Sequence, residues 1–272
     1  MNPYERLSQT QRDRVSDGTT AALLTGCQSA HRLLFIVWPQ LGDFDSLEYA
    51  WWLQREQVRL QTANIAVRAV GIGDRASGQQ FCRYTGFPTE HLFVDPTAAI
   101  HQKLALYPGL SWKIPGLTPG QQAWVNLMLM CAGIGSPGTL AEVLRGYTGD
   151  RTAPQLIGDQ ETIRDTPLPP LPGSFFKWAG GKGFQRPFEL ATRRLQNMTE
   201  VLSKWTTYVP DASYLTQRGG TFLFDSEGHL LYEHRDRGIL GFAEDMSHPL
   251  AFLFEEIPTA QAESPLTAGQ EA

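Results

Sequence analysis

A buried strand and the start of a helix meet within residues 33–48, and the polar side chains at that junction are the best placed for chemistry. The run from Leu33 to Trp38 is apolar, and a helical pattern begins a few residues later. The free N–H groups and the dipole of a helix N-terminus favour negative charge, so a cysteine placed there becomes a nucleophilic thiolate. The chain instead carries Asp43 and Ser46 where a Cys-x-x-Cys pair would stand.

A carboxylate suits the electrostatics of this junction, but it cannot attack a peroxide or form a disulfide. The structural interpretation is that Asp43 or Asp45 caps the helix, with Glu48 completing a capping box three residues after Asp45. The alternative is that these carboxyl groups do acid–base work or anchor a polar ligand. Asp43, Ser46 and Glu48 are therefore the candidate site.

The composition limits the class of protein. The chain has 272 residues and a formal net charge of -5, which allows a large core and disfavours a general nucleic-acid binder. Its histidines lack zinc-type spacing and no Cys-x-x-Cys occurs, so we expect no metal and no other cofactor. No apolar run reaches the length of a membrane span, and the N-terminus lacks a signal-peptide core. These features predict a cytoplasmic protein.

The three cysteines, Cys27, Cys82 and Cys131, are far apart in the sequence, which suits a reducing compartment better than a disulfide framework. Cys27 lies just before the first strand and is predicted to be the most exposed. Cys82 and Cys131 lie in helical segments and are predicted to be buried. Cys27 and Cys82 are the candidate thiols for any redox chemistry.

Strands and helices alternate over the first 106 residues. Apolar runs predict strands at 33–38, 65–72 and 91–94. Helical patterns follow them at 44–62, 77–84 and 97–106. This order is typical of βαβ units in a parallel sheet. The polar segment 4–24 is predicted to form one or two helices.

The alternation then stops, and residues 107–215 form a long insert without a convincing strand. Helices are predicted at 119–131, 139–147 and 188–205, and the proline-rich stretch 159–173 is predicted to be a loop. The sheet resumes with strands at 220–224 and 229–234, which a hairpin turn joins. A closing helix is predicted at 243–254, and residues 257–272 are predicted to form a disordered tail.

Several segments, taken in order, resemble the peroxiredoxin-like 2 group of the AhpC/TSA superfamily in its cyanobacterial and plastid-type forms. Gly42 and Glu48 match the ends of the Gly-Cys-Pro-x-Cys-Arg-Glu box of that group. Residues 81–88 resemble its Phe-Cys-x-x-Thr-Gly-Phe-Pro stretch, and residues 145–150 and 217–222 resemble the segments before its final hairpin. The resemblance covers roughly residues 30–106 and 215–255.

This resemblance implies a thioredoxin-like fold, in which an α/β mixed sheet is flanked by helices and a large helical insert precedes the final β-hairpin. Residues 1–256 would then form a single domain. For members with intact cysteines, it implies thiol-dependent reduction of peroxides. Asp43 and Ser46 occupy both cysteine positions here, so the redox box is degenerate and the implied mechanism lacks its nucleophile.

An aromatic and glycine-rich loop in the insert is a candidate contact surface for a protein partner. Its aromatic residues are Phe175, Phe176, Trp178 and Phe184. The alternative is that these side chains pack the insert onto the sheet. The neighbouring cations Lys177, Lys182 and Arg186 suggest a further alternative, contact with an anion.

The sequence therefore predicts a non-catalytic binding or assembly protein that uses the degenerate site or the insert as its surface. The rival prediction is a thiol-dependent antioxidant peroxidase or reductase that uses Cys27 or Cys82. A third is a small-molecule binder anchored by Asp43 and Glu48. We expect no nucleic-acid partner and no transmembrane segment; the resemblance also implies a peripheral place on a membrane complex as an alternative to a free cytoplasmic one.

Overall fold

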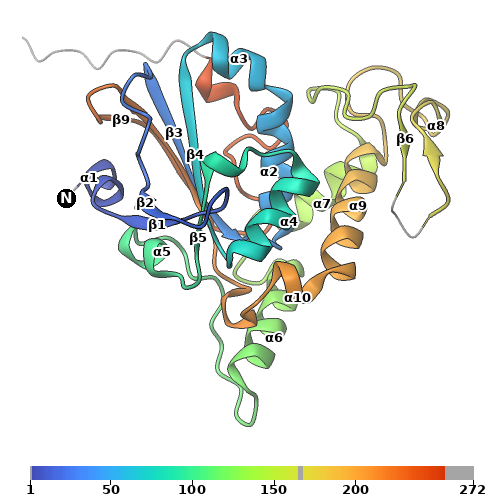
Figure 1. The fold of residues 1–272 in the computed structure, drawn as a ribbon. Coiled ribbons are helices and arrows are strands. Elements are labelled where there is room, and N and C mark those ends of the chain that lie inside the picture. The colour runs from blue at the N-terminus through green and yellow to red at the C-terminus, as the bar shows by residue number, and fades with distance from the viewer. Residues whose placement is uncertain (1, 165–167, 255–272) are drawn as a thin grey trace, which may run out of the picture.

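A seven-stranded mixed sheet forms the centre of the computed structural model, which describes residues 2–164 and 168–254 (Figure 1). The strand order is β2-β1-β5-β4-β3-β8-β9. The strands of the centre are β3 (Arg32–Gln40), β4 (Ile65–Ile72), β5 (Leu92–Asp95), β8 (Gly220–Asp225) and β9 (Leu230–Arg235). β3, β4 and β5 are parallel, while β8 runs antiparallel to both β3 and β9. The predicted thioredoxin-like fold class is confirmed.

β3 is buried over almost its whole length because it lies between β4 and β8 and both of its faces are covered. Successive side chains along a strand point to opposite faces, so the strand contributes to two cores. Leu33, Phe35 and Val37 belong to one apolar cluster, and Leu34, Ile36 and Trp38 belong to the other. This explains why the strand reads as a continuous apolar run.

Helices cover both faces of the sheet. On one face lie α2 (Phe44–Arg55), α4 (Arg75–Thr85) and part of the insert, which share a cluster with Trp38. On the other face, α1 (Pro3–Ser8) and α5 (Ala99–Lys103) contribute Leu7 and Ile100 to the second cluster. The helix predicted at 44–62 is divided at Glu56, where α2 ends and α3 (Gln57–Thr62) begins.

The N-terminal segment differs from its prediction as one or two helices spanning residues 4–24. Only α1 is helical there; β1 (Gln11–Arg14) and β2 (Thr20–Ala22) form a hairpin whose turn contains Gly18 at a φ of 74°. β1 also pairs with the edge of β5, where Asp13 lies opposite Val94. Pairing with an existing sheet edge overrides the weak helical pattern of this polar segment.

The insert contains the three helices predicted for it, namely α6 (Pro119–Cys131), α7 (Thr139–Thr148) and α9 (Glu189–Ser203). It also contains two short helices, α8 (Phe175–Trp178) and α10 (Trp205–Tyr208). The region predicted as a loop holds a small two-stranded sheet of β6 (Thr162–Ile163) and β7 (Leu171–Pro172). In Figure 1 this small sheet and α8 lie at the periphery, beyond α9.

The closing helix predicted at 243–254 is wrong. Within the described residues, that segment contains only a 3-10 turn, η3 (Ala251–Leu253). An Asp245 side chain that accepts from the Ser247 N–H and a proline at position 249 interrupt the helical pattern. Two further 3-10 turns are η1 (Thr89–His91) and η2 (Ala212–Tyr214). The predicted tail at 257–272 lies outside the described residues.

Candidate functional site at the start of helix α2

Asp43 is the N-cap of α2, directly after the turn that follows β3. Its backbone is extended, with φ -75° and ψ 135°, and its carboxylate accepts from the Asp45 N–H at 2.9 Å. This is the N-cap geometry in which a side-chain oxygen satisfies one of the free N–H groups of the first helical turn. The capping role predicted for Asp43 is confirmed.

The capping box predicted for Asp45 and Glu48 is wrong. Asp45 is 1 % exposed and turns inward, where its two carboxyl oxygens lie 2.9 and 2.8 Å from the Leu240 N–H donor. Glu48 points away from the helix start and accepts two hydrogen bonds from Arg194 of α9, at 2.7 and 3.1 Å. Both carboxyl groups therefore join α2 to distant segments of the chain.

The guanidinium of Arg218 lies at the centre of the site and is fully buried. Its Nη2 is 2.5 Å from Oδ2 of Asp43, and its Nη1 is 3.5 Å from Oδ2 of Asp45. Its Nε donates to the Thr216 carbonyl at 3.1 Å, which fixes the plane of the group. The loop before β8 thus places one cation against the N-terminus of α2.

A third carboxyl group, from Asp236, closes the site behind β9. It is 2 % exposed, and its Oδ2 accepts from the Gly219 N–H at 3.1 Å. Burial raises the pKa of Asp236 to about 7, against the opposing effect of the Arg218 charge. Burial and the charge of Asp43 raise the pKa of Asp45 well above its ordinary value. The site therefore favours one ion pair, Asp43 with Arg218, and proton retention on Asp45, while the pKa of Asp236 places its titration near neutral pH.

Ser46 is completely buried, and its hydroxyl donates to the Gln40 carbonyl at 3.1 Å. The insert packs closely over the same turn: a Cβ added at Gly42 would lie 2.8 Å from the Val209 side chain and 2.9 Å from that of Tyr208. This close approach explains the glycine at position 42. It also encloses Ser46.

An ion-pair network extends from the site into the insert. Arg194 bridges Glu48 of α2 and Glu142 of α7, with a distance of 2.7 Å to each. Arg145 continues the network from Glu142 at 2.6 Å to Asp150 at 3.3 Å. Glu48 is thus already paired and 2 % exposed, which leaves it poorly placed to anchor a free ligand.

Two of the three thiols, Cys27 and Cys131, differ from their predicted exposure. Cys27 is only 8 % exposed, so its predicted exposure is wrong, and burial raises its pKa. Cys82 is buried as predicted, and burial raises its pKa to about 12. Cys131 is exposed, contrary to prediction, because it is at the end of α6. Partial desolvation and the charge of Asp43 raise its pKa, so this thiol lies within electrostatic reach of the site.

The four aromatic residues predicted to form a contact surface in the insert differ in exposure: some pack into the core and others face outward. Phe176 is fully buried in the core cluster and Phe175 is half-buried against it. Trp178 is 83 % exposed and Phe184 is 60 % exposed. The predicted contact role of Phe176 is therefore wrong, while Trp178 and Phe184 do face outward.

The cations of the same loop are largely paired. Lys177 forms an ion pair with Asp159, and the buried Arg186 binds Asp159 and Glu189, each at 2.6 Å. Lys182 is exposed. Two of the three cations that suggested an anion site are thus already used in holding the insert together.

Sequence reasoning missed Arg218 and Asp236. Arg218 lies in the segment 217–222 that resembles the family, and its partner Asp43 lies 175 positions away in the sequence. The available signal was a charged residue directly before two glycines and an apolar strand, which is unusual for a position entering a buried strand. Across the described ranges, no three His, Cys, Asp or Glu side chains are grouped to hold a metal ion. In the same ranges, no helix combines the length and apolarity needed to cross a membrane.

The family described as AhpC/TSA antioxidant enzyme matches residues 52–238. The chain belongs to this family. The resemblance drawn from the sequence is confirmed at that level, and the protein is a thioredoxin-fold, peroxiredoxin-like member of the AhpC/TSA family. The matched region begins after Asp43 and Ser46 and includes Arg218 and Asp236. No curated protein matches the chain.

Proposed function

We propose that this AhpC/TSA family member is a non-catalytic binding or assembly protein whose redox box is degenerate. The observation that carries the proposal is the Asp43–Arg218 ion pair, which has an N–O distance of 2.5 Å. Thiol-dependent peroxide reduction requires a thiolate at the helix start and benefits from an adjacent cation. Here a carboxylate takes the place of the thiolate and already neutralises the cation.

Ser46 offers no substitute nucleophile. A serine hydroxyl must be activated by a neighbouring base that accepts its proton. The Ser46 hydroxyl instead donates to a backbone carbonyl, and the residue is fully buried. This arrangement supports a structural role for Ser46 in holding the turn between β3 and α2.

The outward face of the insert is the surface that we propose for a protein partner. Trp178 at the end of α8 and Phe184 in the loop after it are exposed, and an exposed apolar stripe on α7 is formed by Leu140, Leu144 and Tyr147. The stripe residues are spaced by four and three positions, so they lie on one face of the helix. Exposed aromatic and apolar groups of this size mark interfaces more often than isolated surface residues do.

The rival function is a thiol-dependent peroxidase or reductase. Its predicted thiols, Cys27 and Cys82, are buried and have raised pKa values, which lowers their thiolate fraction. Cys131 is a better candidate for this rival, because it is exposed and the charges of Asp43 and Arg218 act on it. Its own raised pKa nevertheless disfavours the thiolate.

The test exposes the reduced protein to near-stoichiometric hydrogen peroxide with a sulfenic-acid trap, followed by peptide mapping. We expect no rapid, selective trapping at Cys27, Cys82 or Cys131. The variant Asp43→Cys, which places a thiol beside Arg218 at the helix start, is expected to be trapped at residue 43 and serves as the positive control. Fast trapping at any natural cysteine would overturn the proposal and establish the thiol enzyme.

The partner surface is tested separately. The paired substitutions Trp178→Ser and Phe184→Ser are expected to abolish cross-linking to a protein partner in native extract. Val58→Ser is the matched control, because Val58 is 74 % exposed on α3 and lies away from the insert. If the doubly substituted insert keeps the same cross-linked species as the control, this surface does not bind the partner.

A further inference from the structure

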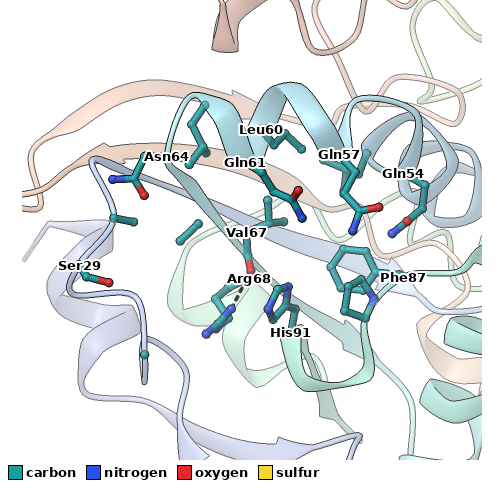
Figure 2. Close-up of a pocket in the computed structure, with 16 residues that line it drawn as sticks. Ser29, Gln54, Gln57, Leu60, Gln61, Asn64, Val67, Arg68, Phe87 and His91 are labelled. Carbon is teal, nitrogen blue, oxygen red and sulfur yellow. Dashed lines mark hydrogen bonds between the residues drawn. The ribbon is translucent and has the colours of Figure 1, made fainter.

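A groove of about 370 Å³ lies at the end of the sheet opposite to Asp43, between the α2–α3 helices, the start of β4 and the segment before β5 (Figure 2). β3 and β4 are parallel, and the groove borders the first residues of β4, whereas Asp43 follows the last residues of β3. The groove and the degenerate site are therefore separate. None of the residues of the Asp43–Arg218 site lines it.

The lining of the groove is cationic and contains no carboxylate. Arg68 and His91 line it, yet no Asp or Glu does, although the whole chain carries 28 acidic residues. Burial and the Arg68 charge lower the pKa of His91, so near neutral pH the fixed charge is that of Arg68. Glu90 raises the His91 pKa from outside the lining.

The guanidinium of Arg68 is held in place by two backbone carbonyls and keeps further N–H donors. Its Nη1 donates to the Val67 carbonyl at 2.9 Å, and its Nη2 donates to the Thr25 carbonyl at 3.0 Å. Its Nε is buried and has no acceptor within the part of the chain that the structure describes. A guanidinium carries five N–H donors and these two bonds use only two of them, so Arg68 retains the capacity to bind an oxygen ligand.

Side-chain amides face this cation across the groove. Gln57 and Gln61 project from α3 toward the space beside Arg68 and His91 (Figure 2). Gln54 and Asn64 also line the groove, and none of these four amide side chains has a recorded hydrogen bond among the described residues. Leu60, Val67 and Phe87 supply an apolar wall. A few convergent polar groups beside an apolar wall are typical of small-molecule sites.

We propose that this groove binds a small organic anion with an apolar body. The anionic group would pair with Arg68 and accept hydrogen bonds from the Gln57 and Gln61 amides, while the apolar body would lie against Leu60 and Phe87. Guanidinium groups bind carboxylates and phosphates through paired, charge-assisted hydrogen bonds. The proposal is independent of the function proposed above, since it uses neither the start of α2 nor the insert.

Calorimetric titration of the full chain with benzoate, phenyl phosphate and benzamide tests the proposal. These probes share a ring and differ in their polar group. We expect at least one of the two anions to bind with a Kd below about 1 mM, and benzamide to bind at least about tenfold more weakly. The stronger of the two anions identifies the head group. Absence of binding by both anions, or equal binding of benzamide, would overturn the proposal.

Two charge-matched variants locate the binding. Gln57→Glu places a carboxylate in the groove and is expected to weaken anion binding about tenfold, through repulsion and loss of an amide donor. Val58→Glu adds the same charge to the next position of α3, outside the lining, and is expected to leave the affinity within about twofold. Equal weakening by both variants would place the anion elsewhere and refute the site.

Arg68→Gln is expected to abolish anion binding. Because Arg68 also holds the Thr25 carbonyl, its thermal unfolding must be measured alongside. If that variant is unfolded, the Gln57→Glu and Val58→Glu pair still decides the question. A folded Arg68→Gln variant that keeps the wild-type affinity would contradict the proposal.

Discussion

Asp43 has two separable roles, as the cap of α2 and as the partner of Arg218. The cap requires only an oxygen acceptor, whereas the ion pair requires a negative charge next to a guanidinium that is 0 % exposed. A buried cation without its partner is strongly destabilising, while a lost cap costs less. An acidic residue at position 43 therefore stabilises the fold whether or not the protein has a redox function.

Substitutions at Asp43 should separate these roles. Asp43→Ala removes both and is expected to lower the free energy of unfolding by roughly 3–5 kcal/mol, as measured by urea denaturation. Asp43→Asn keeps an acceptor for the cap and an uncharged oxygen for the Arg218 guanidinium, so a smaller loss of about 1–3 kcal/mol is expected.

Asp211→Ala is the matched control for the Asp43 series. Asp211 caps η2 by accepting from the Ser213 N–H at 2.8 Å, and its side chain forms no ion pair in the described residues. Its loss is expected to be about 1 kcal/mol. A destabilisation by Asp43→Ala no larger than this value would show that the ion pair contributes little to stability.

Asp236 is expected to make stability fall between about pH 4 and pH 7. Its folded pKa of about 7 exceeds its ordinary value of 3.8, so the folded state binds more protons than the unfolded chain across this window. The free energy of unfolding therefore decreases as the pH rises, and the contribution is absent above the folded pKa. Buried His101 has the opposite effect, because its pKa is lowered to about 4 and unfolding takes up a proton below about pH 6.5.

Asp236→Asn should separate the opposite effects of Asp236 and His101 on the pH dependence of the unfolding free energy. The amide oxygen can still accept from the Gly219 N–H, but the proton linkage of the carboxyl group is lost. Relative to wild type, the variant should gain roughly 2–3 kcal/mol in unfolding free energy on going from pH 4.5 to pH 7. Parallel pH profiles for the two proteins in urea denaturation would contradict the assigned role of Asp236.

At the scale of elements, the sequence predicted those parts of the fold whose burial is visible locally. β3 and β4 appear as apolar runs because both of their faces are covered, and α6 is marked by a Thr118 cap and by Pro119 in its first turn. The β1–β2 hairpin was missed because its polar strands depend on pairing with β5.

The candidate site was predicted only in part for the same reason. The capping role of Asp43 depends only on neighbouring residues, so the sequence predicts it. The pairing of Asp43 with Arg218 and the contact of Asp45 with Leu240 join residues 175 and 195 positions apart. No pattern within a single element predicts such contacts, because they form only when the tertiary fold brings distant segments of the chain together.

Arg194 should be the main electrostatic link between elements. It joins α2, α7 and α9 through Glu48 and Glu142. Arg194→Met is expected to lower the free energy of unfolding by roughly 3–5 kcal/mol, because Glu48 is left buried without a cation. Adding Glu48→Gln to this variant should restore part of the loss, with a coupling of about 1–3 kcal/mol in a double-mutant cycle.

Lys204→Gln is the control on the same helical segment. Lys204 pairs with Glu200 at 2.8 Å, but its side chain is 45 % exposed. Exposed pairs of this kind contribute about 0.3–0.5 kcal/mol. Simple additivity of Arg194→Met and Glu48→Gln would mean that the two side chains do not interact energetically, despite their geometry.

At the scale of the whole molecule, the protein places its distinct features in different parts of the fold. The Asp43–Arg218 site lies after the last residues of β3, and the cationic groove lies beside the first residues of β4. The exposed Trp178 belongs to α8, which lies at the periphery of the insert (Figure 1). A ligand in the groove and a partner on the insert could therefore bind at the same time without competing for a surface.

This arrangement predicts a gradient of stability from the sheet to the periphery, measurable by hydrogen–deuterium exchange. The amides of residues 33–37 are expected to exchange most slowly, because β3 pairs with strands on both sides and its side chains enter both cores. The described residues between 151 and 187 contain only a two-stranded sheet of two residues per strand and one short helix. This segment should exchange at least about tenfold faster through local opening.

The same experiment tests how the peripheral segment is attached. Phe176 and Ile163 extend the core cluster, and the buried Arg186–Glu189 pair joins the segment to the start of α9. Protection should therefore be highest around those residues and lowest at the exposed loop that carries Trp178 and Phe184. Uniform protection across residues 151–187, at the level of β3, would mean that the insert unfolds only with the sheet. The aromatic loop would then be a rigid surface rather than one able to adapt to a partner.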